Sequence, residues 1–250
     1  MLRAALLASL LALPAAAQTP RVKSGSEFLS PDLKALQADE TANPGMLWVD
    51  DGARLWRETA PDGKSCASCH GDATESMKGA ATRYPQVGAE GKLLNLELRI
   101  NECRTQRQIA PAFAYESESL LALTTYVTRQ SIGMPMAAKA DGAAATFYKR
   151  GEAFFHRRQG QLNLSCAQCH DGVAGSRLRA DVISNGAVNG YPAYRLEWQT
   201  LGSLHRRLRA CSLGVRATQF DYGSDEYLSL ELYLAKRSQG LRIESPGLRK

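Results

Sequence analysis

Helical spacing of apolar residues is clearest in two segments that lie far apart in the chain. The segment 120–127 follows the i, i+3, i+4, i+7 spacing of an amphipathic helix, and the segment 227–234 is its counterpart. Glycine follows each of them, at Gly133 and Gly240. The pattern predicts two helices of similar length, each with one face turned toward a core.

A second pair of helices is predicted further upstream. Residues 52–56 and 151–155 each start with glycine and end in two bulky apolar side chains, which we expect to face inward. Another short helix is predicted at 31–37, behind Pro31. The chain contains no convincing run of alternating apolar and polar residues, so the predicted fold class is mostly α.

The order of features is repeated along the chain, which indicates an internal duplication. Two C-x-x-C-H motifs start 100 residues apart, at Cys66 and Cys166. The later counterparts lie 107 or 108 residues apart, namely Tyr84 and Tyr191, Cys103 and Cys211, Tyr126 and Tyr233, and Gly133 and Gly240. An insertion of about seven residues between motif and tyrosine in the second copy reconciles the two offsets.

The C-x-x-C-H motifs predict two covalently bound c-type haems. In such a motif two cysteines form thioether bonds to the haem and the histidine becomes an iron ligand. The attachment residues predicted here are Cys66, Cys69, Cys166 and Cys169, and the proximal ligands are His70 and His170. A zinc site would need further ligands at suitable spacing, and a thioredoxin-like site would need a βαβ context, so neither is favoured.

The repeat then indicates two tandem cytochrome c-like domains. We expect domain 1 at residues 47–139 and domain 2 at 140–250, joined near 140–143. Residues 1–17 have the positive, apolar and small-residue regions of a signal peptide, and 18–46 form an N-terminal extension. No later apolar run is long enough to span a membrane. We therefore expect an exported protein without a transmembrane segment.

The second axial ligand of each iron is open to several interpretations. Met134 and Met136 follow Gly133 and suit the first haem, but the chain has no methionine after Met136 to serve the second. His156 and His205 both lie in the second copy, so they do not supply one ligand to each haem. Symmetry favours the remaining pair of cysteines, Cys103 and Cys211. A disulfide between these two cysteines is the alternative for an exported chain.

The charged residues around Cys211 make it a candidate functional residue. The chain has a formal net charge of +6, or +5 once Arg3 leaves with the signal peptide, and nothing in it resembles a nucleic-acid-binding module. Arginines cluster around Cys211, and Arg207 lies one helical turn before it. A thiolate beside guanidinium groups stays reactive, and a guanidinium binds oxyanions in a bidentate way. A solvated basic surface is the alternative explanation of the cluster.

These motifs resemble the SoxA family, the dihaem cytochrome subunits of thiosulfate-oxidising complexes. The resemblance is carried by the doubled C-x-x-C-H motif, by Ile100–Arg104, and by Arg207–Cys211 followed by Val215–Ala217. It covers nearly all of the predicted mature chain. The haem motifs alone are common to many cytochromes, whereas the two placed cysteines with their arginines are more specific.

The resemblance implies a periplasmic L-cysteine S-thiosulfotransferase that forms a heterodimer with a SoxX-like cytochrome c. Such an enzyme joins thiosulfate oxidatively to a cysteine of a SoxYZ-like carrier and passes electrons to a downstream cytochrome. It implies His70 and Cys103 as ligands of the first haem iron, and His170 and Cys211 as ligands of the second.

The same resemblance makes Cys211, carrying an extra sulfur as a persulfide, and Arg207 the catalytic residues, with Lys236 or Arg237 as a further basic group. The rival function is a dihaem electron-transfer cytochrome without sulfur chemistry. A dihaem peroxidase is less favoured, because neither His156 nor His205 is placed to serve both halves.

Overall fold

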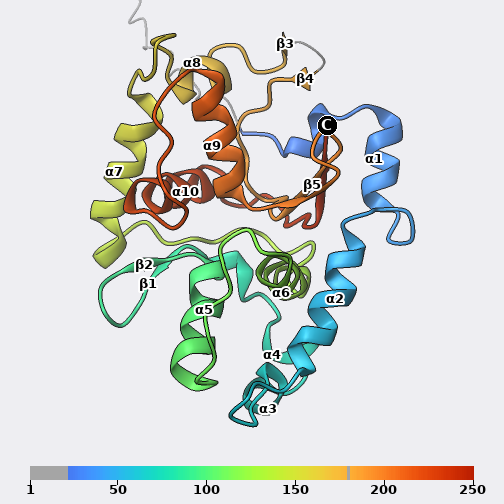
Figure 1. Ribbon diagram of the computed structural model, residues 1–250. Coiled ribbons are helices and arrows are strands. Elements are labelled where there is room, and N and C mark those ends of the chain that lie inside the picture. Colours follow the sequence, from blue (N-terminus) through green and yellow to red (C-terminus); the bar gives the residue numbers. More distant parts are fainter. Residues whose placement is uncertain (1–21, 179–180) are drawn as a thin grey trace, which may run out of the picture.

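The computed structural model describes residues 22–178 and 181–250, so the predicted signal peptide lies outside the described residues. Two helical halves are stacked on each other, the earlier one below and the later one above in Figure 1. This arrangement confirms a mostly helical chain built from two cytochrome c-like units.

The first half follows an N-terminal extension. The extension contains the 3₁₀ turn η1 (Gly25–Phe28) and α1 (Pro31–Ala38), which agrees with the short helix predicted at 31–37. The elements of the first half are α2 (Met46–Arg57), α3 (Cys66–His70), α4 (Ala73–Ser76), η2 (Ala81–Arg83), β1 (Gln86–Val87), β2 (Leu93–Leu94), α5 (Leu96–Arg107) and α6 (Glu118–Arg129).

The second half repeats this order with additions. Its elements are η3 (Gly142–Ala144), α7 (Ala145–His156), α8 (Cys166–His170), β3 (Arg177–Leu178), β4 (Asp181–Val182), β5 (Ala193–Arg195), β6 (Thr200–Gly202), α9 (Leu204–Gly214), α10 (Asp225–Arg237) and β7 (Gly247–Arg249). The β3–β4 hairpin lies where the sequence predicts the insertion. Strands of two or three residues are too short to produce the alternating pattern sought in the sequence.

Small polar side chains start the helices at matching places in both halves. Asn95 accepts a hydrogen bond from the backbone of Leu98 at the start of α5, and Ser203 accepts one from Arg206 at the start of α9. Ser117 and Ser224 cap α6 and α10 in the same way. Each such cap stabilises a helix by about 1 kcal/mol, so the caps fix where the helices that carry Cys103 and Cys211 begin.

Each half is built on one close helix crossing, and a glycine makes each crossing possible. α2 crosses α6 at Gly52, where an added Cβ would lie 2.2 Å from the carbonyl oxygen of Ala122. α7 crosses α10 at Gly151, where a Cβ would lie 2.0 Å from the carbonyl oxygen of Ser229. The backbones therefore touch at both crossings, and no larger residue fits without moving a helix.

Replacing Gly151 with alanine is expected to lower the free energy of unfolding by about 1–3 kcal/mol or more, because the new methyl group overlaps backbone atoms. The midpoint of urea unfolding measures this loss. Gly214→Ala in α9 is the matched control, since a Cβ there meets nothing within 4 Å. Equal midpoints for the two variants would contradict the tight crossing.

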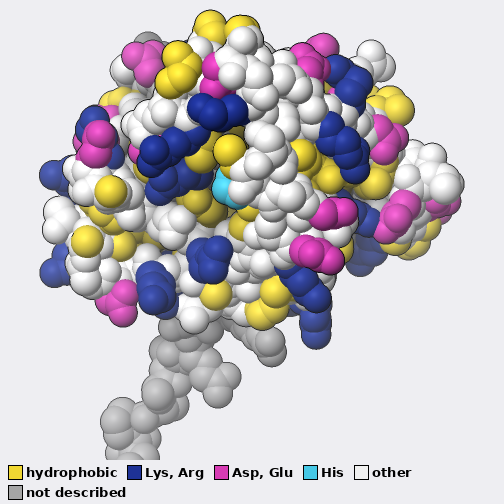
Figure 2. All heavy atoms as spheres, turned by 90° about the horizontal axis from the view of Figure 1, so that it is seen from below, with side chains coloured by type: hydrophobic (Ala, Val, Ile, Leu, Met, Phe, Trp, Pro, Cys, Tyr) yellow, Lys and Arg dark blue, Asp and Glu magenta, His cyan; other side chains and the backbone are white. Residues whose placement is uncertain are grey.

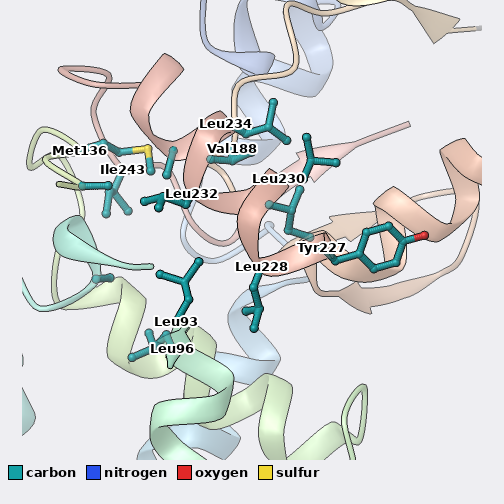
Figure 3. Packing of buried hydrophobic residues seen from close by; sticks show 14 of the residues in the cluster. Leu93, Leu96, Met136, Val188, Tyr227, Leu228, Leu230, Leu232, Leu234 and Ile243 are labelled. Carbon is teal, nitrogen blue, oxygen red and sulfur yellow. The ribbon is translucent and has the colours of Figure 1, made fainter. Parts of the chain in front are cut away.

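One hydrophobic core runs through both halves (Figure 3). Leu228, Leu230, Leu232 and Leu234 project from α10, and Leu93 and Leu96 reach toward them from the first half. Aromatic contacts repeat on either side of the core: Trp56 lies 6.0 Å from Tyr126, and Phe155 lies 5.2 Å from Tyr233 between ring centroids. The two halves are thus packed together rather than joined by a free linker.

A short backbone pairing forms the seam between the halves. Residues 133–136 and 240–243 run antiparallel, with the amides of Gly133 and Met136 donating to the carbonyls of Ile243 and Leu241, respectively. The pairing is centred on Pro135 and Arg242, which are 107 residues apart and therefore occupy the same place in each half. We call residues 133–136 and 240–243 the seam.

The N-terminal extension packs on the second half, although the first half follows it in sequence. Gln37 of α1 accepts hydrogen bonds from the backbone of Leu248 and from the Arg249 guanidinium. Ser24 donates to Glu244 at 2.7 Å. Figure 1 shows α1 beside the C-terminal strand. Both ends of the described chain therefore stabilise the second half.

Candidate functional site

The second C-x-x-C-H motif forms the five-residue helix α8, which is fixed at its start by a capping box. Ser165 accepts a hydrogen bond from the backbone of Gln168, and the Gln168 side chain accepts one from the backbone of Ser165 at 2.9 Å. The motif has the same arrangement in the first half, where Ser65 and Ser68 form the box. Each motif is therefore a rigid turn that presents its histidine at its end.

The His170 ring is oriented by the loop that follows β4. Its Nδ1 lies 2.7 Å from the carbonyl oxygen of Ser184, and the Asn185 side chain donates to the His170 carbonyl at 3.3 Å. Because the carbonyl can only accept, Nδ1 carries a proton toward Ser184, and Nε2 is the nitrogen left to ligate an iron. This arrangement is the one required of an axial iron ligand.

Cys211 meets His170 from α9, and its surroundings favour the thiolate. Burial by itself would raise the pKa of the Cys211 thiol, but the Arg207 guanidinium and a hydrogen bond to the His170 ring outweigh it. Together with Arg195, they lower the pKa of Cys211 to about 7. By contrast, burial raises the pKa of Cys166, a predicted haem-attachment cysteine, to about 12. Cys211 is thus a sulfur held ready to bind a metal or to attack.

Two arginines share the surroundings of this sulfur. The Cys211 thiolate raises the pKa of Arg207, and within the described chain no ion pair or side-chain hydrogen bond engages Arg207. Arg195 on β5 is buried and lies 3.6 Å from Asp181 and 3.4 Å from Glu197. Arg207 is therefore the guanidinium that remains available to an incoming anion.

In the first half α5 brings Cys103 to the first motif, with a different electrostatic result. Burial raises the pKa of the Cys103 thiol, although Arg99 and Arg107 act against it. The Arg99 guanidinium forms an ion pair with Glu102 one turn along α5. Arg104 stacks on Phe113, 3.6 Å from the ring centroid. Two of the arginines that flank Cys103 in the sequence, Arg99 and Arg104, are therefore occupied by other groups.

Arg99 and Arg207 hold equivalent places, four residues before Cys103 and Cys211, respectively. The difference between the two sites comes from one neighbour. Glu102, which engages Arg99, has Ala210 as its counterpart in α9. The duplication has thus left two arginine–cysteine pairs, and an acidic side chain neutralises the arginine of the first pair only.

The first site lies open at the surface. Cys69 and His70 are exposed, and a hollow of about 280 Å³ borders the motif, lined by Trp56, Arg57, Ala67, Gly71, Asp72 and Ala73. Figure 2 views this side of the molecule and shows a histidine side chain among hydrophobic side chains, with Lys and Arg groups around it. The site thus has room and apolar surroundings beside a histidine.

The other candidate ligands make contacts of their own. Met136 is buried in the seam, against Ile243 (Figure 3). His205 is fully buried and accepts a hydrogen bond from the backbone of Gly223, and His156 lies 3.3 Å from the Tyr233 hydroxyl. The structure records all six cysteines as free, so it does not pair Cys103 with Cys211.

The two further basic residues suggested by the sequence differ in position. Arg237 forms an ion pair with Asp171 at 2.5 Å, directly after His170, and its guanidinium covers the Phe155 ring at 4.6 Å. Arg237 is therefore the one tied to the second motif. Sequence reasoning missed Arg195, because its only local signal is a single arginine in a short strand.

The donor sets fit c-type haem. Each site offers two cysteines, a histidine and a further cysteine sulfur from a second helix, and this combination of thioether-forming residues with two axial ligands is what such a haem requires. The described residues contain no group of three or more His, Cys, Asp or Glu side chains arranged to hold a bare metal ion. The arrangement favours haem over a zinc site.

Comparison with known proteins gives a consistent result. Residues 51–136 and 150–243 match the family described as "SoxA/TsdA, cytochrome c domain". The chain is 40% identical over 230 residues to the L-cysteine S-thiosulfotransferase subunit SoxA of Pseudaminobacter salicylatoxidans, covering 91% of this chain and 80% of that protein. It is 36% identical to the subunit of the same name from Paracoccus pantotrophus, covering 91% and 79%.

A solved structure is similar as well. The crystal structure described as SoxXA from P. pantotrophus superposes with a TM-score of 0.88 at 36% identity, covering 92% of this chain and 87% of that one. Among the described residues no helix has the length and apolar character needed to cross a membrane.

Proposed function

The chain belongs to the SoxA/TsdA cytochrome c family, and we propose that it is the SoxA subunit of a periplasmic L-cysteine S-thiosulfotransferase. The reaction joins thiosulfate to the cysteine of a SoxYZ-like sulfur carrier with loss of two electrons. The partner is a SoxX-like cytochrome c, and electrons pass on to a downstream cytochrome. One observation carries the proposal: the pKa of Cys211 is lowered to about 7 beside Arg207, a guanidinium that no ion pair or side-chain hydrogen bond engages among the described residues.

Two c-type haems complete the protein in this proposal. Cys66 and Cys69 attach the first, with His70 and Cys103 as its iron ligands. Cys166 and Cys169 attach the second, with His170 and Cys211 as its iron ligands. When bound, the haem near Cys211 supplies an acceptor for the electrons that the reaction releases.

Arg207 binds the substrate. Part of the negative charge of thiosulfate lies on the oxygens of its sulfonate group, and a planar guanidinium donates two parallel hydrogen bonds to such an oxyanion. Since Arg207 lies one helical turn before Cys211, an anion bound there directs its terminal sulfur toward the Cys211 sulfur. Arg195, whose charge is shared with Asp181 and Glu197, adds positive potential.

Cys211 handles the sulfur. A bond between the sulfur on Cys211 and the terminal sulfur of thiosulfate forms with loss of two electrons, which the haem and the SoxX-like partner would accept. The carrier thiolate then attacks the thiosulfate sulfur of that bond, so the thiosulfate group moves to the carrier and the sulfur on Cys211 leaves as an anion. In the proposal Cys211 carries an extra sulfur as a persulfide, which places the reacting atom further from α9. Arg237, paired with Asp171 beside the second motif, is proposed to support this side of the site rather than to bind substrate.

Intact mass of the protein isolated from its own periplasm, without reductant, is the first test. We expect a mature chain that starts near Gln18 and carries two haems, with additional sulfur mapped to the Cys211 peptide. Two haems and an unmodified Cys211, combined with no thiosulfate conjugation by the complex, would favour a dihaem electron-transfer cytochrome. A disulfide between Cys103 and Cys211 would exclude both as iron ligands.

A further inference from the structure

A buried cavity lies between the two halves, away from both haem motifs. Its volume is about 60 Å³. Most of its lining consists of equivalent positions from the two halves, such as Tyr84 with Tyr191, Thr124 with Glu231, and Met136 with Ile243. Leu96 and Val188, visible in Figure 3, also line it. The cavity, like the seam, is therefore lined by residues that hold the same place in the two halves.

The two halves differ at this cavity in their titratable side chains. Glu97, the second residue of α5, lines the cavity and is only 6% exposed. Its counterpart in α9 is His205, which is fully buried. Glu231 of α10 lines the same cavity, whereas its counterpart in α6 is Thr124. Two carboxyl groups from different halves thus share one enclosed space.

Glu97 differs from its neighbours, because the hydrogen bond recorded for its carboxyl group comes from its own backbone amide. Glu231 accepts a hydrogen bond from Asn95 at 3.1 Å and lies 3.0 Å from His205 Nε2. Glu116 accepts a hydrogen bond from the Ser203 backbone, and its other oxygen lies 4.0 Å from Arg206. Among the described residues no ion pair or hydrogen bond from another side chain engages Glu97. The His205 ring and the Arg206 guanidinium thus lie next to the other two carboxylates.

The remaining titratable groups do not offset this deficit. Tyr115 lies between the rings of His205 and Tyr222, with centroids 5.4 and 5.1 Å away, and its hydroxyl oxygen accepts a hydrogen bond from Asn95 at 2.7 Å. Tyr84 and Tyr191 also line the cavity. An ionised Glu97, only 6% exposed, would therefore face Glu231 without a counter-charge.

We infer that the cavity between the halves is a proton-binding site, in which a proton on Glu97 holds the two halves together and its loss loosens the seam. The inference is independent of the sulfur chemistry. It makes the contact between the halves, and with it the relation between the two haem sites, sensitive to alkaline pH.

The direction of the effect follows from linkage. Burial, followed by the charge of Glu231, raises the pKa of Glu97 to about 8 from an ordinary value of 4.5. Between these two pH values the folded protein binds one proton more than the unfolded chain. Stability is therefore fully present below pH 4.5, falls as pH rises, and levels off above pH 8. The unfolding equilibrium constant rises about tenfold per pH unit in this window.

The test is urea unfolding of the haem-containing full chain between pH 5 and pH 9, compared with Glu97→Gln. Glutamine keeps the shape of the side chain and removes its ionisation. We expect the variant to lose the tenfold-per-unit slope and to be more stable than the wild type at pH 9. Glu90→Gln, an exposed position paired with Lys92, should keep the wild-type slope. Parallel profiles for the wild type and Glu97→Gln would overturn the inference.

Hydrogen exchange of the wild-type protein gives a second readout that needs no variant. The seam amides of Gly133, Met136, Gly240 and Ile243 are hydrogen-bonded only while the halves stay together. After correction for intrinsic rates, we expect their exchange to accelerate between pH 6 and pH 9 by at least as much as that of amides inside α6, which exchange through global unfolding. Equal protection of the seam at both pH values would show that the proton does not control the contact.

Discussion

Replacing Cys211 with serine is expected to lower the rate of thiosulfate conjugation to the carrier cysteine by about a thousandfold or more, since the reacting sulfur is removed. Serine keeps the size of the side chain, but a hydroxyl does not ionise near neutral pH and does not carry sulfur. The measurement is single-turnover conjugation by the complete complex, followed by the mass of the carrier.

Cys103→Ser is the matched control for this substitution. Cys103 holds the equivalent place in the first half, but burial raises the pKa of its thiol and Glu102 occupies its arginine. We expect this variant to change the absorption spectrum of the first haem and to keep most of the conjugation activity. Equal losses in the two variants would mean that sulfur chemistry is not confined to the second site.

Replacing Arg207 with alanine is expected to reduce kcat/KM for thiosulfate by about a hundredfold to a thousandfold, as is usual when a charged donor to a developing anion is removed. Arg207→Lys should recover only part of this loss, because an ammonium group keeps the charge but not the paired hydrogen bonds. Steady-state kinetics at varied thiosulfate concentration measures both effects. Arg99→Ala, the equivalent change beside Cys103, should leave kcat/KM close to the wild-type value.

A gain of charge tests the same point without removing Arg207. Ala210→Glu places a carboxylate three residues after Arg207, which copies the relation of Glu102 to Arg99. We expect the introduced carboxylate to form an ion pair with the guanidinium and to raise KM for thiosulfate. The rate at which an uncharged thiol-oxidising reagent reacts with Cys211 should change less. Unchanged kinetics in this variant would show that the anion does not bind at Arg207.

The helices and the repeat were predictable because their signals are local. The apolar residues between Leu120 and Val127 predicted α6, although the structure buries every residue from Leu120 to Thr128 rather than one face, and the C-x-x-C-H motifs are contiguous. The state of the arginines was not predictable in this way. Arg99 and Arg207 have similar neighbours in sequence, and only the folded helix shows that Glu102 forms an ion pair with Arg99.

The positions of two other segments in the fold also depend on contacts between residues far apart in the sequence. Met134 and Met136 lie in a segment typical of axial ligands, yet its backbone pairs with residues 240–243, and Met136 is buried there. The N-terminal extension is polar and carries no marker of its target, and Gln37 finds its partners more than 200 residues away. Contacts at such separation leave no periodic trace in a single sequence.

The seam has a consequence for the origin of the chain. Because its pairing is centred on residues that hold the same place in each half, the contact is of the self-complementary kind that two identical protomers form around a two-fold axis. A single ancestral module could therefore have made this contact as a homodimer, and gene fusion would have preserved it. Once both copies lay in one chain, selection could act on each separately. The glutamate at position 102 and the alanine at the equivalent position 210 are one result of this separate selection.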